Sequence, residues 1–375
     1  MKGINFNDST PLYEQVQNDL KFRIREGEFK IGEQIKSHSR LAGEYNVSLI
    51  TIKKALSNLI IEGVLISRVG KGTFVADRNP NHAHSNHKSI GIVLRDLEHP
   101  FFTQVVQSIE SEAYNLGFNA LLSSSLGNEK KEEGQINHFK RIGTSGLVIA
   151  SLSLIYKATK AIRNLHDNNF PYVMVSYVHD PDIWFVGTDH ELGGFLAGEH
   201  LIQLGYKKLG YVHGGKGNIL GEVRKNGFSR ALNEYGIDFN SNYIYYLEDK
   251  LDRYHSGYSM GKKFIKLEDR PEAIFIYTDL AAIGFQRAIL EEGWNIPDDI
   301  AIIGNDDIAS AKFAPVPLTT IRQQSDLIGH LAAETVIRRI NGEDSPNRII
   351  VRPMLIARQS TPASEVSKLE AISLE

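Results

Sequence analysis

The sequence of 375 residues contains no cysteine. This absence excludes a disulfide framework, an iron–sulfur centre, a thiol nucleophile and a cysteine-ligated zinc site. No apolar run approaches the ~18 residues that a membrane span requires, and the start MKGINFNDSTPLYEQV lacks the apolar core of a signal peptide. We therefore expect a cytoplasmic protein with no membrane partner.

The common enzyme motifs are also missing: there is no G-x-S-x-G, no H-E-x-x-H and no P-loop. The glycines of Gly215–Gly221 have the wrong spacing for a dinucleotide-binding loop, so we expect a mobile loop facing a ligand cleft there. Asp306 and Asp307 are the nearest approach to a catalytic carboxylate pair. Neighbouring side chains on a strand point in opposite directions, however, and we expect Asp307 to cap the following helix. These observations predict a protein that is not an enzyme and holds no cofactor.

Charge is unevenly distributed along a chain whose net charge is only −3. Residues 1–78 carry 12 basic and 9 acidic side chains, whereas the remainder carries 30 and 36. Between these parts, residues 79–88 are polar and lack apolar periodicity, which predicts a linker. Its three histidines have no carboxylate or cysteine nearby, so we expect a solvated segment and no metal site at His82, His84 and His87. The composition, 42% hydrophobic and 23% charged, is that of a folded chain of two or three units.

The first 78 residues carry the pattern of a helix-turn-helix followed by a hairpin. Apolar residues at every fourth position predict a helix over 11–26. Ser37 caps a second helix that ends at Asn46, and Ser48 caps a third after a short turn. Two alternating runs then flank the glycines around Lys71, which predicts a β-hairpin, or wing. We predict a small α/β winged helix-turn-helix domain.

From residue 89 onward, short apolar strands alternate with helices, which predicts parallel sheets covered on both faces. There are more strands than one small sheet holds, so two doubly wound α/β lobes are expected. Ligands bind beyond the carboxyl ends of such strands. Polar residues stand at several of those ends, and carboxylate and guanidinium groups make charge-assisted bonds to hydroxyls. The residues at these ends are Arg95, Asp96, Ser123–Ser125, Thr278, Asp279, Asp306 and Asp307. Of these, Asp96, Ser125, Thr278 and Asp306 are the expected effector contacts.

The N-terminal segments PLYEQVQNDLKFRIREGEF, GEQIKSHSRLAGEYNVSLITIKKALSNLIIEGVL and GKGTFVA resemble the winged-helix domain of the GntR family. The resemblance implies dimeric binding to a palindromic operator in double-stranded DNA. It places the helix entered by Val47-Ser48 in the major groove and the wing tip in the minor groove. The candidate DNA-binding residues are Ser37, Ser39, Arg40, Ser48, Leu49, Ile50, Thr51, Lys53, Lys54, Arg68, Gly70, Lys71 and Gly72.

This segment departs from the family pattern at several positions. Lys36 replaces the usual proline, and Ser39, Leu49 and Lys53 stand where arginines are frequent. An arginine can donate two hydrogen bonds to guanine, whereas a leucine can donate none. We therefore expect Leu49 and Ile50 to contact thymine methyl groups. Four basic residues of this segment are candidates for phosphate contacts: Lys53, Lys54, Arg68 and Lys71. The alternative is that they are solvated surface charges with no DNA contact.

The C-terminal segments, among them IGIVLRDLEHPFFTQVVQSIESEAYNLGFNALLSSS and YTDLAAIGFQRAILEEGWNIPDDIAIIGNDD, resemble the LacI/GalR family and periplasmic sugar-binding proteins. The resemblance covers about residues 89–361. It implies an effector-binding and dimerisation domain over 89–375, with two lobes joined by three crossovers. Lobe 1 is expected over about 89–188 and 323–345, and lobe 2 over about 189–322 and 346–375.

The same resemblance adds effector contacts to those expected at the strand ends. It implies an aromatic pair at Phe101 and Phe102, and polar contacts from Ser176, Arg224, Asp306 and Gln323. Ser176 and Thr278 differ from the Asp and Asn common at their positions. The alternatives are that Phe101 and Phe102 belong to the core and that Arg224 and Asp306 form surface ion pairs.

Together these features predict a ligand-responsive transcription regulator. We expect a repressor that binds its operator as a homodimer and is released by a small sugar-like effector, with a corepressor arrangement as the alternative. A cytoplasmic sugar-binding or catabolic protein without a DNA role is the competing interpretation, and it leaves the wing and recognition helix unexplained. The resemblance implies that the apolar faces of 101–116 and of the helix from Ala281 are dimer surfaces.

Overall fold

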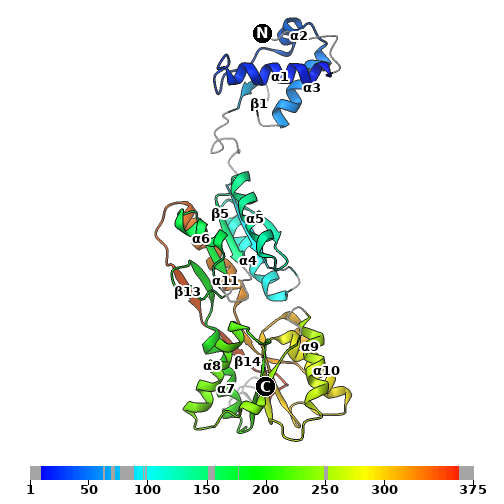
Figure 1. The fold of residues 1–375 in the computed structure, drawn as a ribbon, viewed down its shortest axis with the longest axis vertical. Coiled ribbons are helices and arrows are strands. Elements are labelled where there is room, and N and C mark those ends of the chain that lie inside the picture. Colours follow the sequence, from blue (N-terminus) through cyan, green and yellow to red (C-terminus); the bar gives the residue numbers. More distant parts are fainter. Residues whose placement is uncertain are drawn as a thin grey trace, which may run out of the picture. The chain divides into compact units, whose positions relative to one another are not determined.

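The computed structural model describes residues 10–61, 64–68, 72–76, 88–95, 97, 99–150, 157–175, 177–248 and 252–362. The chain forms two compact units, residues 1–87 and 88–375 (Figure 1). The predicted linker, with its three histidines, lies outside the described residues except for Lys88, which begins a strand. Within the described ranges, no helix is long and apolar enough to cross a membrane.

The first unit is the predicted winged helix-turn-helix. Ser37 accepts a hydrogen bond from the amide of Arg40, Asn46 ends its helix in the left-handed conformation, and Ser48 accepts one from the amide of Thr51. These local contacts explain why the helices begin and end where the sequence predicts. The elements are α1 (Leu12–Arg25), α2 (His38–Tyr45), α3 (Leu49–Ile61) and an antiparallel hairpin of β1 (Leu65–Arg68) and β2 (Gly72–Val75). Their shared core includes Val16, Leu20, Leu41, Ile52, Leu56 and Leu59.

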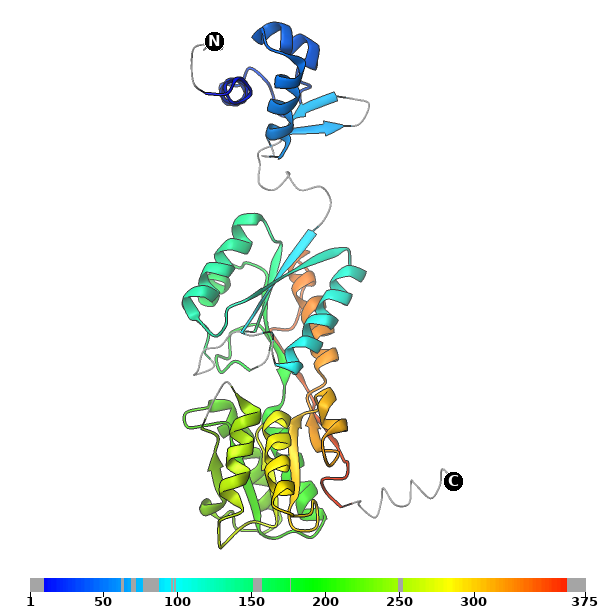
Figure 2. The same ribbon diagram turned by 90° about the vertical axis from the view of Figure 1, so that its right-hand side faces the viewer.

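The second unit begins with a six-stranded parallel sheet in the order β13-β7-β6-β5-β3-β4. Its strands are β3 (Lys88–Leu94), β4 (Phe118–Ser124), β5 (Gly146–Ala150), β6 (Tyr172–Val175), β7 (Phe185–Thr188) and β13 (Arg348–Val351). Helices α4 (Pro100–Asn115) and α11 (Ser325–Ile340) pack side by side on one face (Figure 2). The other face buries α5 (Glu129–Ile142) and α6 (Lys160–Asp167). Both faces are covered, which explains why these strands are almost wholly apolar.

A second sheet follows in the order β14-β12-β11-β10-β8-β9, parallel except for β14. Its strands are β8 (Leu209–His213), β9 (Ile244–Tyr246), β10 (Ala273–Ile276), β11 (Ala301–Asp306), β12 (Thr319–Arg322) and β14 (Met354–Ile356). One face buries α7 (His190–Gln203) and α8 (Ile219–Glu234), and the other buries α9 (Arg253–Phe264) and α10 (Asp279–Glu291) (Figure 1). Two short 3-10 helices, η1 (Ser241–Tyr243) and η2 (Ala309–Phe313), complete this lobe.

Glycines bring the helices of each pair in the second lobe into close contact. A Cβ at Gly194 on α7 would lie 1.9 Å from the carbonyl oxygen of Arg224 on α8. A Cβ at Gly257 on α9 would lie 2.0 Å from the carbonyl oxygen of Ala281 on α10. No side chain fits at such separations, so α8 holds Arg224 at a position set by backbone-to-backbone packing.

The chain passes between the two lobes three times, as expected. The crossovers run from β7 to α7, from β12 to α11, and from β13 to β14. The predicted start of the last lobe 2 segment at residue 346 is wrong, because β13 pairs with β7 in the first sheet. The third crossover therefore lies at residues 352–353, between strands of different sheets, where the sequence shows no break in polarity.

Candidate effector site and DNA-binding surface

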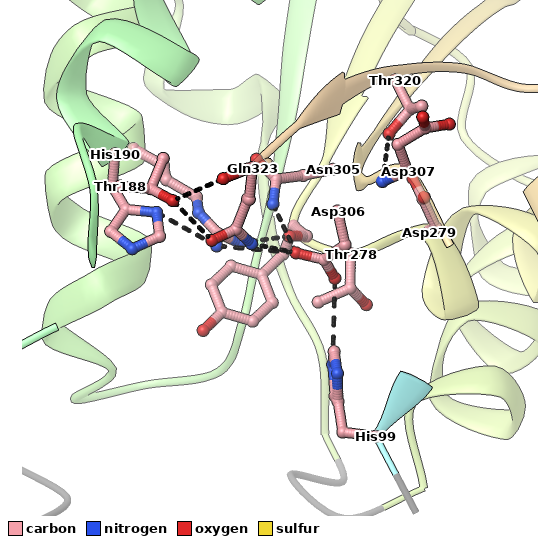
Figure 3. Close-up of polar contacts among 12 residues, drawn as sticks. His99, Thr188, His190, Thr278, Asp279, Asn305, Asp306, Asp307, Thr320 and Gln323 are labelled. Carbon is pink, nitrogen blue, oxygen red and sulfur yellow. Dashed lines mark hydrogen bonds and ion pairs between the residues drawn. The ribbon is translucent and has the colours of Figure 1, made fainter. Parts of the chain in front are cut away.

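Polar side chains from both lobes meet at the carboxyl ends of the strands, around Asp306 at the end of β11 (Figure 3). Asp306 Oδ1 accepts hydrogen bonds from Asn305 Nδ2 at 2.7 Å and from Gln323 Nε2. Arg224 Nη2 lies 3.9 Å from the same oxygen. His99 of the first lobe brings Nε2 within 3.8 Å of Asp306 Oδ2. We call this group the interlobe cluster: His99, Thr188, His190, Arg224, Asn305, Asp306 and Gln323.

Arg224 on α8 is the cation of the interlobe cluster and is only 2% exposed. Its Nη1 donates to the carbonyl oxygen of Tyr277 at 2.6 Å, and its guanidinium carbon lies 4.7 Å from the centre of the Tyr277 ring. A buried guanidinium needs such partners because desolvation of its charge is costly. The side chain is therefore fixed in place before any ligand arrives.

His190, the first residue of α7, adds a neutral donor to the interlobe cluster. Burial, followed by the positive charge of Arg224, holds the pKa of His190 well below its usual value. Arg224 Nη2 lies 3.4 Å from His190 Nδ1, and since a guanidinium only donates, the imidazole proton must sit on Nε2. Within the described residues, His190 Nε2 and Arg224 Nε are both buried without an acceptor. Two buried N–H groups are thus left to bind oxygen atoms of a ligand.

The interlobe cluster also connects two of the three crossovers. Thr188 ends β7 at the first crossover, and its hydroxyl donates to Gln323 Oε1 at 3.2 Å. Gln323 follows β12 at the second crossover and donates in turn to Asp306. A ligand that displaces or strengthens these bonds acts directly on the segments that join the lobes.

The prediction that Arg224 and Asp306 lie on the second lobe, and Phe101 and Phe102 on the first, agrees with the strand and helix assignments. The side chains of Arg224 and Asp306 are buried, so the alternative that they form surface ion pairs is wrong. Sequence reasoning missed His99, Thr188, His190 and Asn305. Thr188 and His190 flank a crossover, and that position in the chain is the signal that would have found them.

Other expected effector residues have structural roles. Phe101 belongs to the core of the first lobe, while Phe102 is half-buried with its ring centre 5.2 Å from that of Phe101. Ser125 donates to the carbonyl oxygen of Leu94 at 3.1 Å. Thr278 caps α10 by accepting from the amide of Ala281 at 3.4 Å. Asp96 and Ser176 lie outside the described residues.

Asp307 does not cap the next helix, so that prediction is wrong. Its carboxylate binds Arg322 Nε at 2.6 Å and Arg358 Nη2 at 2.5 Å. Asp306 and Asp307 therefore point to different partners, as expected for adjacent residues at a strand end. Within the described residues, no group of three or more His, Asp or Glu side chains is placed to hold a metal ion.

In the first unit, most of the candidate DNA-binding residues are exposed. The exposed ones are Ser37, Ser39, Arg40, Ser48, Leu49, Ile50, Lys53, Lys54 and Gly72, and Thr51 is half-buried. Ile50 on α3 is a large apolar side chain with 78% exposure. Lys54 Nζ lies 4.1 Å from the centre of the Tyr13 ring, so it packs toward α1. Gly70, Lys71 and the side chain of Arg68 lie outside the described residues.

Comparison with known proteins relates both units to bacterial regulators. Residues 12–75 match the bacterial regulatory proteins of the gntR family, and residues 199–361 match the periplasmic binding protein-like domain. The arabinose metabolism transcriptional repressor of Geobacillus stearothermophilus is 31% identical over 364 residues, which cover 94% of this chain and 98% of that repressor. The chain belongs to the family of this repressor. Its two units are the GntR-type helix-turn-helix domain and the two-lobed domain of that family.

Two further relatives each match about three quarters of the chain. The transcriptional repressor PurR of Mannheimia succiniciproducens is 28% identical over 275 residues, covering 73% of this chain and 81% of that protein. A LacI family transcriptional regulator of Enterococcus faecium, solved with bound ribose, has a TM-score of 0.63 and 27% identity, covering 73% of this chain and 98% of that one. The chain with the printed sequence is accordingly a transcription regulator and not an enzyme.

Proposed function

We propose that the protein is a repressor that binds an operator through α3 and the hairpin, and that a small sugar held by the interlobe cluster releases it. A regulator of this kind acts where the chromosome lies, in the cytoplasm. The observation that carries the proposal is the interlobe cluster. Its side chains come from both lobes and from two crossovers, and all of them are buried except His99, which is half-buried. A ligand bound there has different contacts in different lobe arrangements, which is the requirement for an allosteric effector.

The chemistry of the interlobe cluster supports a polyhydroxylated ligand. A sugar hydroxyl both donates and accepts, so it can accept from the buried N–H groups of His190 and Arg224 and donate to Asp306. The half-buried ring of Phe102 provides an apolar surface near His99, with the two ring centres 5.9 Å apart. The relatives indicate which sugars to test as ligands, since one relative is named for arabinose metabolism and another was solved with bound ribose.

The test combines a gel shift with calorimetry. The full chain is titrated onto DNA from upstream of its own gene, with and without arabinose, ribose or glucose, and each sugar is titrated into the protein. We expect specific retardation that one of the sugars abolishes at concentrations near its Kd. A sugar that strengthens retardation would establish the corepressor arrangement, and sugar binding without any retardation would establish a binding protein with no DNA role.

We further propose that the regulator is a homodimer, because a palindromic operator requires a two-fold protein. The apolar faces suggested by the sequence are occupied: α4 buries Val105 and Ile109 in one lobe, and α10 buries Phe285 in the other. Exposed apolar side chains instead gather after α4 and along β4, an edge strand. They are Leu116, Leu121, Leu122 and Leu126. An exposed apolar edge strand can pair with a strand of another chain. Because a palindromic operator requires two copies of the protein, we propose that a second copy of this chain packs against β4.

Sedimentation velocity tests this dimer surface. The wild-type chain is expected to sediment as a dimer at micromolar concentration, and Leu122→Glu as a monomer. Ile350→Glu is the matched control, because Ile350 is exposed on β13 at the opposite edge of the same sheet. A dimeric Leu122→Glu variant would place the interface elsewhere, and dissociation of both variants would show that β4 has no special role.

A further inference from the structure

The backbone that presents Asp306 is strained. Asp306 has a φ of 123° and Asp307 a φ of 55°, so two consecutive residues with side chains adopt a region that favours glycine. A residue with a side chain persists in such a strained conformation only where its surroundings hold it. We call these two residues the left-handed turn. The groups that hold it decide where the Asp306 carboxylate lies.

Two buried side chains outside the interlobe cluster hold the left-handed turn (Figure 3). The amide of Ile308 donates to Asp279 Oδ2 at 2.9 Å. The amide of Asp307 donates to Thr320 Oγ1 at 3.4 Å, and the Thr320 hydroxyl donates to Asp279 Oδ1 at 2.5 Å. One carboxyl group therefore binds two consecutive backbone amides, one directly and one through a hydroxyl.

The fold makes a specific space for this carboxyl group. Asp279 is the first residue of α10 and is fully buried. Its Oδ1 lies 2.2 Å from where a Cβ of Gly304 would be, so only glycine fits at that position of β11. Gly304 is on the strand that Asp306 ends, which brings the carboxyl group directly behind the turn.

We propose that Asp279 and Thr320 are positioning residues for effector binding, which fix the left-handed turn and so direct the Asp306 carboxylate toward Arg224 and Gln323. The inference rests on the proposed function, since it takes the interlobe cluster to be the effector site. Asp279 acts through the Asp307 and Ile308 amides, not by touching the ligand. Loss of the hydroxyl at residue 320 frees the Asp307 amide and lets the turn relax away from its left-handed geometry.

The neighbouring threonine on β12 provides a matched control. Thr319 is also fully buried, but its hydroxyl contacts Thr361 Oγ1 at 2.9 Å and the backbone of Arg358, with the carbonyl oxygen at 3.1 Å and the amide at 2.8 Å. It binds neither the Asp307 amide nor the Ile308 amide. Thr320→Val and Thr319→Val therefore each remove one buried hydroxyl from the same strand. Thr320→Ser keeps the hydroxyl and serves as the conservative rescue.

The experiment measures sugar binding by calorimetry for these three variants of the full chain, using whichever of arabinose, ribose and glucose the wild type binds. Thr320→Val is expected to weaken binding roughly tenfold, the equivalent of about one lost hydrogen bond. Thr319→Val and Thr320→Ser are expected to bind within twofold of the wild type, and operator affinity without sugar is expected to be unchanged. Equal weakening in Thr319→Val and Thr320→Val would show a general structural effect and overturn the proposal.

Hydrogen exchange of the sugar-free protein separates this inference from the proposed function. The amides of Asp307 and Ile308 are expected to exchange slowly in the wild type, and the Asp307 amide at least tenfold faster in Thr320→Val. If the wild type binds none of the three sugars, the proposed effector class is wrong, while this measurement still decides what holds the turn. Unchanged exchange at Asp307 in Thr320→Val would refute the role of Thr320.

Discussion

Replacing Arg224 by alanine is the most direct test of the interlobe cluster. The change removes the guanidinium beside the buried carboxylate of Asp306, together with the 2.6 Å hydrogen bond to the carbonyl oxygen of Tyr277. Both Arg224 and Asp306 are more than nine-tenths buried. Removing one partner of a buried pair leaves the other charge uncompensated. The change also removes the buried Nε–H that Arg224 offers to a ligand, and a hydrogen bond from a charged donor contributes ~1.5–3 kcal/mol.

A loss of ~1.5–3 kcal/mol corresponds to a sugar Kd raised by about one to two orders of magnitude. Calorimetry on Arg224→Ala is the assay, with a gel shift to show that operator binding is retained and no longer responds to sugar. Arg230→Ala is the control, because Arg230 lies on the same helix in an exposed pair with Glu191 and such pairs contribute at most ~1 kcal/mol. If Arg224→Ala fails to fold, Arg224→Lys keeps the charge and loses the planar fork, and an intermediate Kd is expected. Wild-type sugar affinity in either Arg224 variant would refute the assignment of the site.

Three further outcomes follow from the described contacts. Lys53→Ala should weaken binding to specific and non-specific DNA alike and lower the salt slope by about one unit, as measured by anisotropy over a range of KCl concentrations. Gly227→Ala should destabilise the fold by ~1–3 kcal/mol, because its Cβ would lie 1.8 Å from the carbonyl oxygen of Glu191, whereas Gly134→Ala in an open part of α5 should not lower the melting temperature. Burial, followed by the charge of Asp306, raises the pKa of Asp279 to about 8. The folded protein then holds a proton that the unfolded chain releases near pH 4, so stability should fall as pH rises from about 4 to about 8. Urea unfolding should show that Asp279→Asn loses less stability over this range than the wild type does; equal losses would exclude Asp279 as the titrating group.

The sequence by itself determined the local elements and their order. Ser37 and Ser48 specify helix starts by accepting from the amides three residues on, and Asn46 ends its helix in the left-handed conformation, so these roles can be predicted without a fold. The alternation of apolar strands and helices likewise predicted two doubly wound lobes, because a strand covered on both faces must be apolar throughout. Arg224, Asp306 and Gln323 were found because each stands in a segment that resembles a known family.

Only the tertiary structure decided which partners these side chains have. Asp307 looked like a helix cap, but Arg322 and Arg358 approach it from other parts of the chain and bind its carboxylate. The membership of β13 in the first sheet depends on pairing with β7, which lies more than a hundred residues earlier. Asp279 stands at a strand end in the sequence, but its own segment does not identify its partners, because its two carboxyl oxygens find donors on β12 and on the turn after β11. Helix caps and apolar periodicity depend on residues that are near one another in the sequence, so the sequence alone predicts them. The contacts that build the proposed effector site join segments that only folding brings together.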